Sequence, residues 1–471
     1  MKSNNRQEQL VKNTAILTFG KICTQCISFF LLPLYTALLD PSDYGIVDLI
    51  STYATLLLPI FNLMIDMGLF RFMIDVRDQN DKQKRIVSSV LNFNHLQAIV
   101  FLMAFLLIQF FLDPEYRIFL ALEVLLNIYT STFMQVARGI GRNDVYSVSS
   151  FLSASLSVAF NVVFIAVFRM GALGMFLGLI AAKILTNIYL ILALRIWNLY
   201  DIKCFDKKLL SEISSYSLPL VPNQLAWWVV GASDRIVVSK ILSVAQNGVY
   251  SVANKFSSMY ITFYNIFNLA WTESCALHIN DEDSDVYLSG VISTMFSLIS
   301  AVCIGIAACM PFAFPILVNS NYHEAYFQIP ILLFAVLCQS VIGLVSVVYT
   351  AKKLSGELAK TSIWIAIINL GTDLLLIKHI GLYAASVSTL VAYFVMMIYR
   401  CNDVKKYIHI IIPISKIVKT VLLIICVGVA YYSNSIVLQI IALGFAIVYA
   451  LIENRLFLVS GVDTILRRFN R

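Results

Sequence analysis

Long apolar stretches follow one another along almost the whole chain and are separated by short polar connections. A helix that spans a membrane needs about 20 predominantly apolar residues, and the pattern predicts fourteen such helices. They are expected at about 14–38, 44–72, 86–112, 117–137, 144–168, 172–195, 214–242, 246–277, 288–318, 326–351, 358–378, 381–400, 414–433 and 435–457. The longest polar stretches have roughly a dozen residues, so no separate soluble domain is expected.

Composition agrees with this pattern. Of the 471 residues, 59% are hydrophobic and only 13% are charged, and the mean hydropathy is +0.82. A water-soluble fold of this length could not bury so much apolar surface, whereas a bilayer solvates it. The predicted fold class is therefore an all-α polytopic membrane protein.

Lysine and arginine predict the orientation, because they are enriched in cytoplasmic loops. With a cytoplasmic N-terminus, the inner segments hold 26 of the 34 basic residues, and the outer loops hold only Arg117, Arg169, Lys240 and Lys378. Both termini are therefore predicted to be cytoplasmic, and the net charge of +7 is interpreted as a topology signal, not as evidence for nucleic acid. One inner loop, 278–287, has four acids and no lysine or arginine, which leaves a miscounted span open as an alternative.

The chain contains an internal repeat. A shift of 203 positions places Leu39 on Leu242, Gly45 on Gly248 and Asn62 on Asn265. Six spans, an even number, separate the two copies, so both copies have the same orientation, as in transporters built from parallel repeats. The predicted domains are six-helix lobes at 1–200 and 201–412, followed by two extra helices and a basic tail at 413–471.

Polar residues at helical spacing follow the second predicted span and recur in the eighth. The first set comprises Asp48, Thr52, Thr55, Pro59, Asn62 and Asp66, and the shift carries it to Ser251, Lys255, Ser258, Thr262, Asn265 and the apolar Leu269. Small polar residues also permit close helix packing, which is the alternative. Because the stripe recurs, we expect a water-filled cavity, whose lining Gln25 and Gln224 complete from the first and seventh spans.

Four cations lie well inside predicted spans: Lys21, Lys183, Arg235 and Lys255. Charges at membrane depth usually face a cavity or the bundle interior, although long side chains near a membrane face can reach the headgroups. Their charge-assisted hydrogen bonds suit phosphate oxygens, so these residues are predicted to bind a substrate diphosphate.

Buried acids supply the opposite charge. Glu123, Asp234 and Asp373 are candidates for ion pairs with the cations or for binding a coupling proton or sodium ion. No other cofactor and no catalytic residue is predicted. The nine cysteines and five histidines offer no metal-ligand spacing apart from Cys23-x-x-Cys26, which lies within a predicted membrane helix.

Two stretches resemble a known family. "SLPLVPNQLAWWVVGASDRIVV" followed by "NGVYSVANK" is similar to the seventh and eighth spans of bacterial polysaccharide biosynthesis flippases, and "NTAILTFGKICTQCISFFLLPLYTALLDPSDYGIVDL" is similar to their first two spans. The pieces that carry the likeness are Pro33, Tyr44, Gly45, Pro219, Pro222, Trp228, Asp234-Arg235, Gly248, Tyr250 and Ala253 to Lys255.

That resemblance implies a flippase of the multidrug/oligosaccharidyl-lipid/polysaccharide exporter superfamily in the cytoplasmic membrane. The implied substrate is an undecaprenyl-diphosphate-linked oligosaccharide for O-antigen, capsule or another surface polysaccharide, moved by alternating access. A polysaccharide polymerase and a chain-length regulator are the implied partners, besides membrane lipids. The last two spans could offer a groove for the lipid tail, as in peptidoglycan-precursor flippases. Those proteins are richer in arginine in the first span, where this chain has only Lys21 deep in the span.

Three other classes of protein are alternatives to a flippase. A multidrug cation antiporter shares the fold, but its cavity should favour acids and aromatics over four cations. A membrane polymerase or glycosyltransferase needs long outer loops, whereas the outer connections here are short, so no enzyme is predicted. A purely structural scaffold would not need charged residues repeated inside the membrane.

The proline residues Pro33, Pro59, Pro219 and Pro222 are expected to let helices bend during transport.

Overall fold

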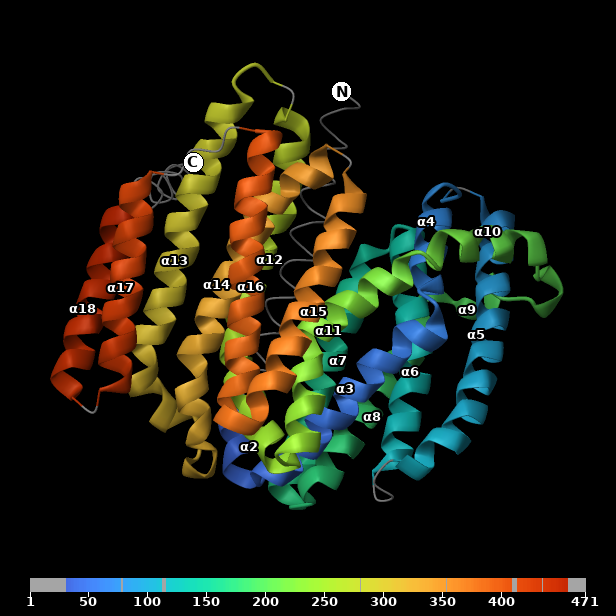
Figure 1. Ribbon diagram of the computed structural model, residues 1–471. Helices are drawn as coiled ribbons and strands as arrows, with labels where there is room; N and C mark the ends of the chain where they lie inside the picture. The colour runs from blue at the N-terminus through green and yellow to red at the C-terminus, as the bar shows by residue number, and fades with distance from the viewer. Residues whose placement is uncertain are drawn as a thin grey trace, which may run out of the picture. The chain divides into compact units, whose positions relative to one another are not determined.

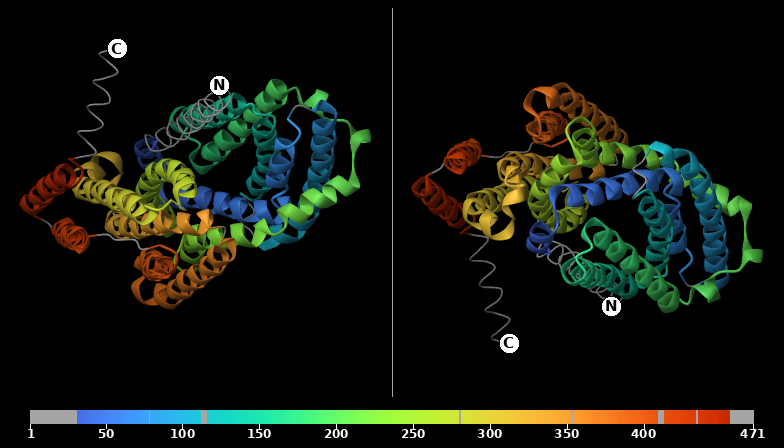
Figure 2. Two further views of the ribbon diagram at one scale, coloured as in Figure 1. Left: turned by 90° about the horizontal axis from the view of Figure 1, so that it is seen from above. Right: turned by 90° about the horizontal axis from the view of Figure 1, so that it is seen from below.

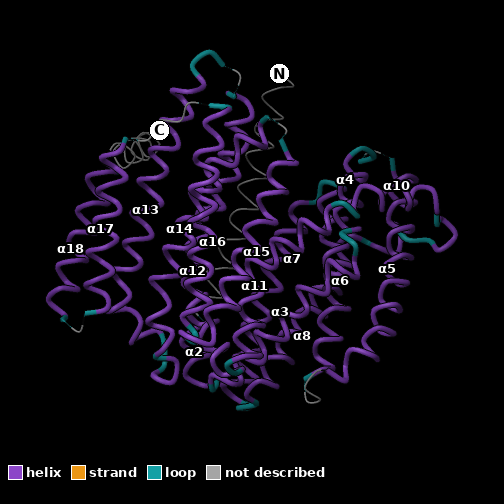
Figure 3. Tube along the Cα trace, viewed as in Figure 1, coloured by secondary structure: helices purple, strands orange, loops and turns teal. Residues whose placement is uncertain are grey.

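The computed structural model describes residues 31–77, 79–111, 116–279, 281–352, 354–408, 413–433 and 435–455. Throughout this part of the chain the regular secondary structure is helical and no strand is found (Figures 1 and 3). The chain divides into two compact units, residues 1–248 and 249–471. The lobe boundaries expected from the sequence, at 200 and 412, stay a prediction.

The first unit contains the helices up to the start of α12. They are α2 (Leu32–Leu38), α3 (Pro41–Asn62), α4 (Ile65–Ile74), α5 (Asn80–Ile108), α6 (Arg117–Gly139), α7 (Asn143–Asn161), α8 (Gly171–Leu194), α9 (Ile196–Leu199), α10 (Lys207–Ser217) and α11 (Leu220–Ile241). Short 3-10 turns lie at Gln109–Phe111 (η1) and Ile202–Cys204 (η3), and a π-helical stretch, η2 (Val162–Val167), continues α7.

The second unit takes over within α12 (Val244–His278). It continues with α13 (Ser284–Leu317), α14 (Glu324–Ala351), α15 (Ser355–Ile380), α16 (Tyr383–Asp403), α17 (Ile414–Tyr432) and α18 (Ile436–Glu453), and with the 3-10 turns η4 (Ser320–Tyr322) and η5 (Val404–Lys406). α14 packs between α13 and α16, α15 packs on α16, and the last two helices pack on α13.

Eleven of the described helices are long and apolar enough to cross a membrane, so the chain is a multi-pass membrane protein. Each of them coincides with one of the fourteen predicted spans. Most of the first predicted span lies outside the described residues. The seventh and eighth spans form helices α11 and α12, but both carry many polar residues along their length, among them Asp234, Arg235 and Lys255. The count of fourteen therefore stays a prediction.

The second predicted span is not one continuous helix, and this corrects the expectation for 44–72. α3 ends at Asn62, and Leu63 and Met64 adopt left-handed φ values of 53° and 54° before α4 begins. Pro59 has no N–H for the carbonyl of Thr55, which weakens the last turn of α3. The helix closes one turn later, where Leu63 N donates to Pro59 O at 3.1 Å.

The seventh predicted span also begins later than expected. Residues 214–217 belong to a separate amphipathic helix, α10, and α11 starts at Leu220 directly after Pro219. A proline is compatible with the first turn of a helix, where its missing N–H has no partner to lose. Pro219 and Pro222 therefore mark the start of α11 and do not interrupt it.

Helix α6 occupies the centre of the first unit. One hydrophobic cluster joins it to α4 and α5 around Leu69, Val90 and Val136, and a second joins it to α3 and α8 around Ala54, Val124 and Phe176. All six of these side chains are at most 1% exposed. Burial of this kind holds α3 against α6 and α8, and it leaves the opposite side of α3 to contact α11.

In the second unit, two tyrosines fasten α17 to α14. The rings of Tyr326 and Tyr431 stack with centroids 4.3 Å apart. Tyr431 OH donates to Tyr326 O at 2.7 Å, and Tyr326 OH donates to Tyr431 O at 3.2 Å. The last helix pair is therefore attached to α14 by specific polar contacts and packs on α13.

Candidate functional site

Helix α3 crosses the start of α12 at two glycines. A methyl group on Gly45 would overlap the carbonyl oxygen of Val244 and lie 2.8 Å from the amide nitrogen of Gly248. A methyl group on Gly248 would overlap the carbonyl oxygen of Pro41 and lie 3.0 Å from the amide nitrogen of Gly45. Only glycine lets two helix backbones approach this closely. Asn247 strengthens the crossing, because its Nδ2 donates to Gly45 O at 3.0 Å.

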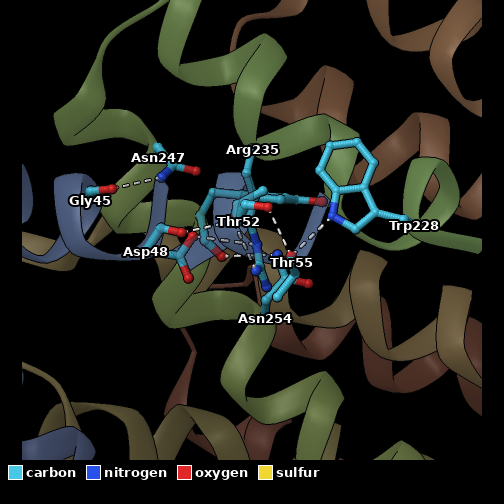
Figure 4. A network of polar contacts seen from close by, with 9 residues as sticks. Gly45, Asp48, Thr52, Thr55, Trp228, Arg235, Asn247 and Asn254 are labelled. Carbon is cyan, nitrogen blue, oxygen red and sulfur yellow. Dashed lines mark hydrogen bonds and ion pairs between the residues drawn. The ribbon is translucent and has the colours of Figure 1, made fainter. Parts of the chain in front are cut away.

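One turn further along α3, Arg235 of α11 reaches the predicted polar stripe (Figure 4). Its Nε lies 3.4 Å from Asp48 Oδ2, and one terminal nitrogen donates to Thr52 Oγ1 at 3.5 Å. Asp48 and Thr52 are one turn apart on α3, so they share a face. The structure thus brings together three residues that the sequence placed in the predicted cavity lining and diphosphate site.

Trp228 extends this cluster toward the other end of α11. Its indole Nε1 donates to Thr55 Oγ1 at 3.0 Å (Figure 4). Thr52 and Thr55 each bond their own helix, to Asp48 O and Thr52 O at 2.8 Å. We call Asp48, Thr52, Thr55, Trp228 and Arg235 the α3–α11 cluster.

Arg235 retains donor capacity in this cluster. Its side chain is 25% exposed, and both of its contacts to α3 are long for charge-assisted hydrogen bonds. A guanidinium has five N–H donors in a planar fork, so an anion can bind without displacing Asp48. Asp234 precedes it but is only 4% exposed, and neighbouring residues on a helix point about 100° apart.

A second ion pair lies on the other side of α3. Lys183 Nζ of α8 lies 2.8 Å from Glu123 Oε1 of α6, and Ser51 Oγ donates to Glu123 Oε2 at 3.4 Å. The two charged side chains are 19% and 11% exposed. The sequence proposed Lys183 for the substrate and Glu123 for coupling or an ion pair, and the structure places them in contact. A substrate role for Lys183 stays a prediction.

The C-terminal end of α3 is held by a buried amide network. Asn62 Nδ2 donates to Asp66 Oδ1 at 2.9 Å across the helix break, and Gln97 Nε2 donates to Asn62 O at 2.9 Å. Asn62 and Thr52 are both 2% exposed. In this conformation these two members of the predicted stripe are packed within the first unit and do not face open space.

The remaining predicted lining residues have mixed surroundings. Gln224 is exposed on α11; on α12, Ser251 is buried, Lys255 and Ser258 are half-buried, and Asn265 is exposed. Thr262 Oγ1 donates to Ser258 O at 2.8 Å. Lys21 and Gln25 lie outside the described residues, so their predicted roles are untested.

Asp373 of α15, the third candidate for coupling, is completely buried in the second unit. Asn369, one turn earlier, is also fully buried, and its Nδ2 donates to Thr389 Oγ1 of α16 at 3.4 Å. Thr389 in turn donates to Ala385 O at 2.9 Å. Among the described residues, no set of three or more His, Cys, Asp or Glu could hold a metal ion.

Sequence reasoning missed a buried arginine at the C-terminal end of α16. Arg400 is 3% exposed and bonds Ser346 of α14 and, at 2.6 Å, Thr361 of α15. The sequence grouped Arg400 with the topology-determining basic residues at span ends. Only the three-dimensional packing of three helices distinguishes it from its exposed neighbours.

The fold is shared with solved structures of membrane transport proteins. It is similar to an inward-facing multidrug resistance MATE family transporter of the MOP superfamily, with a TM-score of 0.64 at 13% identity over 81% of this chain and 95% of that one. It is also similar to the lipid II flippase MurJ in an inward closed conformation, with a TM-score of 0.71 at 15% identity over 96% and 100% of the two chains. An outward-facing MATE family transporter of the MOP superfamily is similar with a TM-score of 0.56, at 13% identity over 84% of this chain and 96% of that one.

The sequence identifies the family. The model of the polysaccharide biosynthesis protein family matches residues 10–272, which is more than half of the chain. The chain belongs to this family, so the resemblance seen in the sequence is confirmed, together with the transporter fold. Among curated proteins no sequence match is found.

Proposed function

We propose that this protein flips undecaprenyl-diphosphate-linked oligosaccharide units across the cytoplasmic membrane, for O-antigen, capsule or another surface polysaccharide. The observation that carries the proposal is Arg235, a partly exposed cation held by Asp48 and Thr52 within a membrane protein of the polysaccharide biosynthesis family. The exposed N–H groups of a guanidinium match the oxygens of a diphosphate in charge and geometry.

The rest of the α3–α11 cluster supports such a site. Thr55 and Gln224 are exposed, and their polar groups suit a hydrated sugar. Trp228 presents an amphipathic ring beside them, fixed in orientation by its bond to Thr55. Lys255, and Lys21 and Gln25 from the first predicted span, would add to the same lining under the predicted repeat.

Membrane topology is part of the proposal. Fourteen spans with both termini in the cytoplasm would give two six-helix lobes, 1–200 and 201–412, and an extra pair within 413–471. The reciprocal contacts of Gly45 and Gly248 support a two-fold relationship between the repeats, because each glycine meets the equivalent part of the other copy. Alternating access would then move the two lobes about their interface.

A coupling ion is also proposed. Glu123, Asp234 and Asp373 are the predicted candidates for binding a proton or a sodium ion, and all three are buried. Of the three, Asp373 lies one turn from the buried Asn369 on α15, and a neutral oxygen beside a buried carboxylate suits a small hard cation. Glu123 is already engaged by Lys183, so we assign it to an ion pair.

The partners follow from the same assignment. The lipid tail of the substrate would stay in the bilayer beside α17 and α18, while a polymerase and a chain-length regulator would receive the flipped unit.

A multidrug cation antiporter is the second candidate, since the MATE transporters share the fold. The cation of the α3–α11 cluster weighs against a cationic substrate.

The test uses the native host with Arg235→Ala and, as a matched control on the same helix, Lys240→Ala. Membrane levels are first confirmed, then surface polysaccharide and lipid-linked oligosaccharide are quantified. The proposal predicts that Arg235→Ala loses surface polymer and accumulates lipid-linked units on the cytoplasmic leaflet, while Lys240→Ala does neither. Normal surface polymer with altered resistance to cationic drugs would favour the antiporter.

A further inference from the structure

The connector between α8 and α11, residues 195–219, is fastened to α5 by a regular set of polar bonds. Asp201 N donates to Ser88 Oγ at 2.9 Å, and Asp201 Oδ2 accepts from Lys84 Nζ at 3.0 Å. Asp206 repeats the arrangement with the next residues along α5, Ser89 and Arg85. Its N donates to Ser89 Oγ at 2.9 Å, and its Oδ2 lies 2.7 Å from Arg85. Both carboxylates of residues 195–208 are therefore directed toward α5.

Asp206 also starts α10. Its Oδ1 accepts from the backbone N–H groups of Lys208 and Leu209 at 3.0 and 3.1 Å. Ile196 and Ile213 anchor the two ends of the connector, being 7% and 0% exposed. The connector runs beside α5 (Figure 2). Its hydrogen bonds and its burial place the two acids and the buried aliphatic residues toward the helices.

The opposite side of the connector carries apolar and basic residues together. Trp197, Ile202 and Phe205 are 56%, 68% and 45% exposed. Arg195, Lys203 and Lys207 are exposed between them. No carboxylate of the described residues forms an ion pair with these three basic side chains. We call these six residues the connector belt.

The connector belt lies at the level where the candidate membrane spans of α5 and α8 end. The candidate span of α8 ends at Leu194, directly before Arg195, and that of α5 begins at Asn80, shortly before Lys84. Under the proposed topology, on which this step rests, that level is the cytoplasmic boundary of the bilayer. Aromatic residues concentrate at such boundaries, and the inner leaflet attracts clustered basic residues through its anionic lipids.

We propose that the connector belt binds anionic phospholipid headgroups of the inner leaflet. Trp197, Ile202 and Phe205 insert at the acyl boundary, while Arg195, Lys203 and Lys207 contact the phosphates. The inward turn of Asp201 and Asp206 leaves the outer side positively charged, which is the property that selects anionic over zwitterionic lipids. Through the bonds to Lys84, Arg85, Ser88 and Ser89, a bound lipid would steady α5 and the first unit in the membrane.

The test compares Lys203→Gln/Lys207→Gln with Lys352→Gln/Lys405→Gln, which removes the same charge from exposed residues elsewhere on the predicted inner face. Binding of phosphatidylglycerol and of phosphatidylcholine to each purified protein is measured by native mass spectrometry. The proposal predicts that the first variant binds phosphatidylglycerol roughly fivefold more weakly for each charge removed. Phosphatidylcholine binding and the control variant should not change.

A second measurement places the belt in the bilayer. Tryptophan fluorescence of wild type and Trp197→Phe is compared in vesicles that contain brominated phosphatidylglycerol. The proposal predicts a quenched component that disappears with Trp197→Phe. Unchanged phosphatidylglycerol affinity in the belt variant, or a Trp197 contribution that the brominated lipid does not quench, would overturn the proposal. Transport of the lipid-linked oligosaccharide by the same variants reports separately on the proposed function, because no belt residue belongs to the α3–α11 cluster.

Discussion

Gly45 and Gly248 lie against each other where α3 crosses the start of α12, and each faces the carbonyl of the residue four positions before the other. They are also the two positions that the 203-residue repeat aligns. A two-fold relationship between repeats produces such a reciprocal contact, because each residue meets the counterpart of its own neighbour.

Even small substitutions where α3 crosses the start of α12 should affect stability and transport. Gly45→Ala and Gly248→Ala should each lower thermal stability and surface polysaccharide, because the added methyl group meets backbone atoms that cannot rotate away. Gly428→Ala on α17 is the control, since nothing lies within 4 Å of its added carbon. Alanine there should be neutral or stabilise the helix by up to about 1 kcal/mol. Equal behaviour of all three variants in thermal unfolding and polysaccharide assays would contradict the close approach.

Asp48 is expected to compete with the substrate for Arg235. Asp48→Asn removes the charge that lies 3.4 Å from Arg235 Nε but keeps the shape of the side chain. A partly exposed ion pair is worth about 1 kcal/mol or less, so binding of an isoprenyl diphosphate should tighten by up to about fivefold. Calorimetry on the purified protein measures this, with Asp40→Asn at the exposed start of α3 as the control. Weaker binding in Asp48→Asn would show that the carboxylate orients the guanidinium more than it competes.

Substitutions in the Lys183–Glu123 pair distinguish a structural role of Lys183 from a role in substrate binding. Glu123→Gln leaves a mostly buried ammonium without its 2.8 Å partner and should cost up to about 3 kcal/mol in the free energy of unfolding. The double variant Glu123→Leu/Lys183→Met removes both charges and should regain most of that stability. If Lys183 also binds the substrate, as the sequence predicts, the double variant will be stable but transport-deficient. Full transport by a stable double variant would leave the pair with a packing role alone.

Titration of Asp206 should make the stability of the protein depend on pH. The N–H of Leu209 at the start of α10, and then the nearby Arg85, hold the pKa of this carboxyl below its usual range. A lowered folded-state pKa stabilises the fold above the unfolded pKa of about 3.9, and this contribution is lost as pH falls through the folded-state value. Asp206→Asn still caps α10 but cannot titrate. The difference in melting temperature between wild type and Asp206→Asn should therefore shrink as pH falls from about 6 to about 3, and a constant difference would contradict the assignment.

Much of the fold is predictable because a long apolar segment satisfies its own backbone hydrogen bonds in a bilayer by forming a helix. Eleven described helices coincide with predicted spans for this reason. The break at Leu63 and Met64 was not predicted, although Pro59 lies four residues earlier. Whether a proline bends a helix or precedes its end depends on packing that a sequence pattern does not contain.

The site was predictable in part. Helical spacing placed Asp48, Thr52 and Thr55 on one face, and the structure adds Arg235 and Trp228 as their partners on α11. Contacts between distant segments are not encoded in spacing. Ser51 is adjacent to Thr52, yet it bonds Glu123 on the other side of α3. The connector belt was likewise not predicted, because the sequence does not show that Asp201 and Asp206 bond α5 and leave the basic residues on the other side.

Flipping itself gives the most direct test of the central claim. Purified wild-type protein and Arg235→Ala are reconstituted into liposomes with an undecaprenyl-diphosphate-linked oligosaccharide, and exposure of the sugar on each leaflet is followed with time. The same vesicles are assayed for uptake of a cationic dye. We predict that wild type equilibrates the oligosaccharide between leaflets, that Arg235→Ala does not, and that neither moves the dye. Dye uptake without movement of the oligosaccharide would contradict the account.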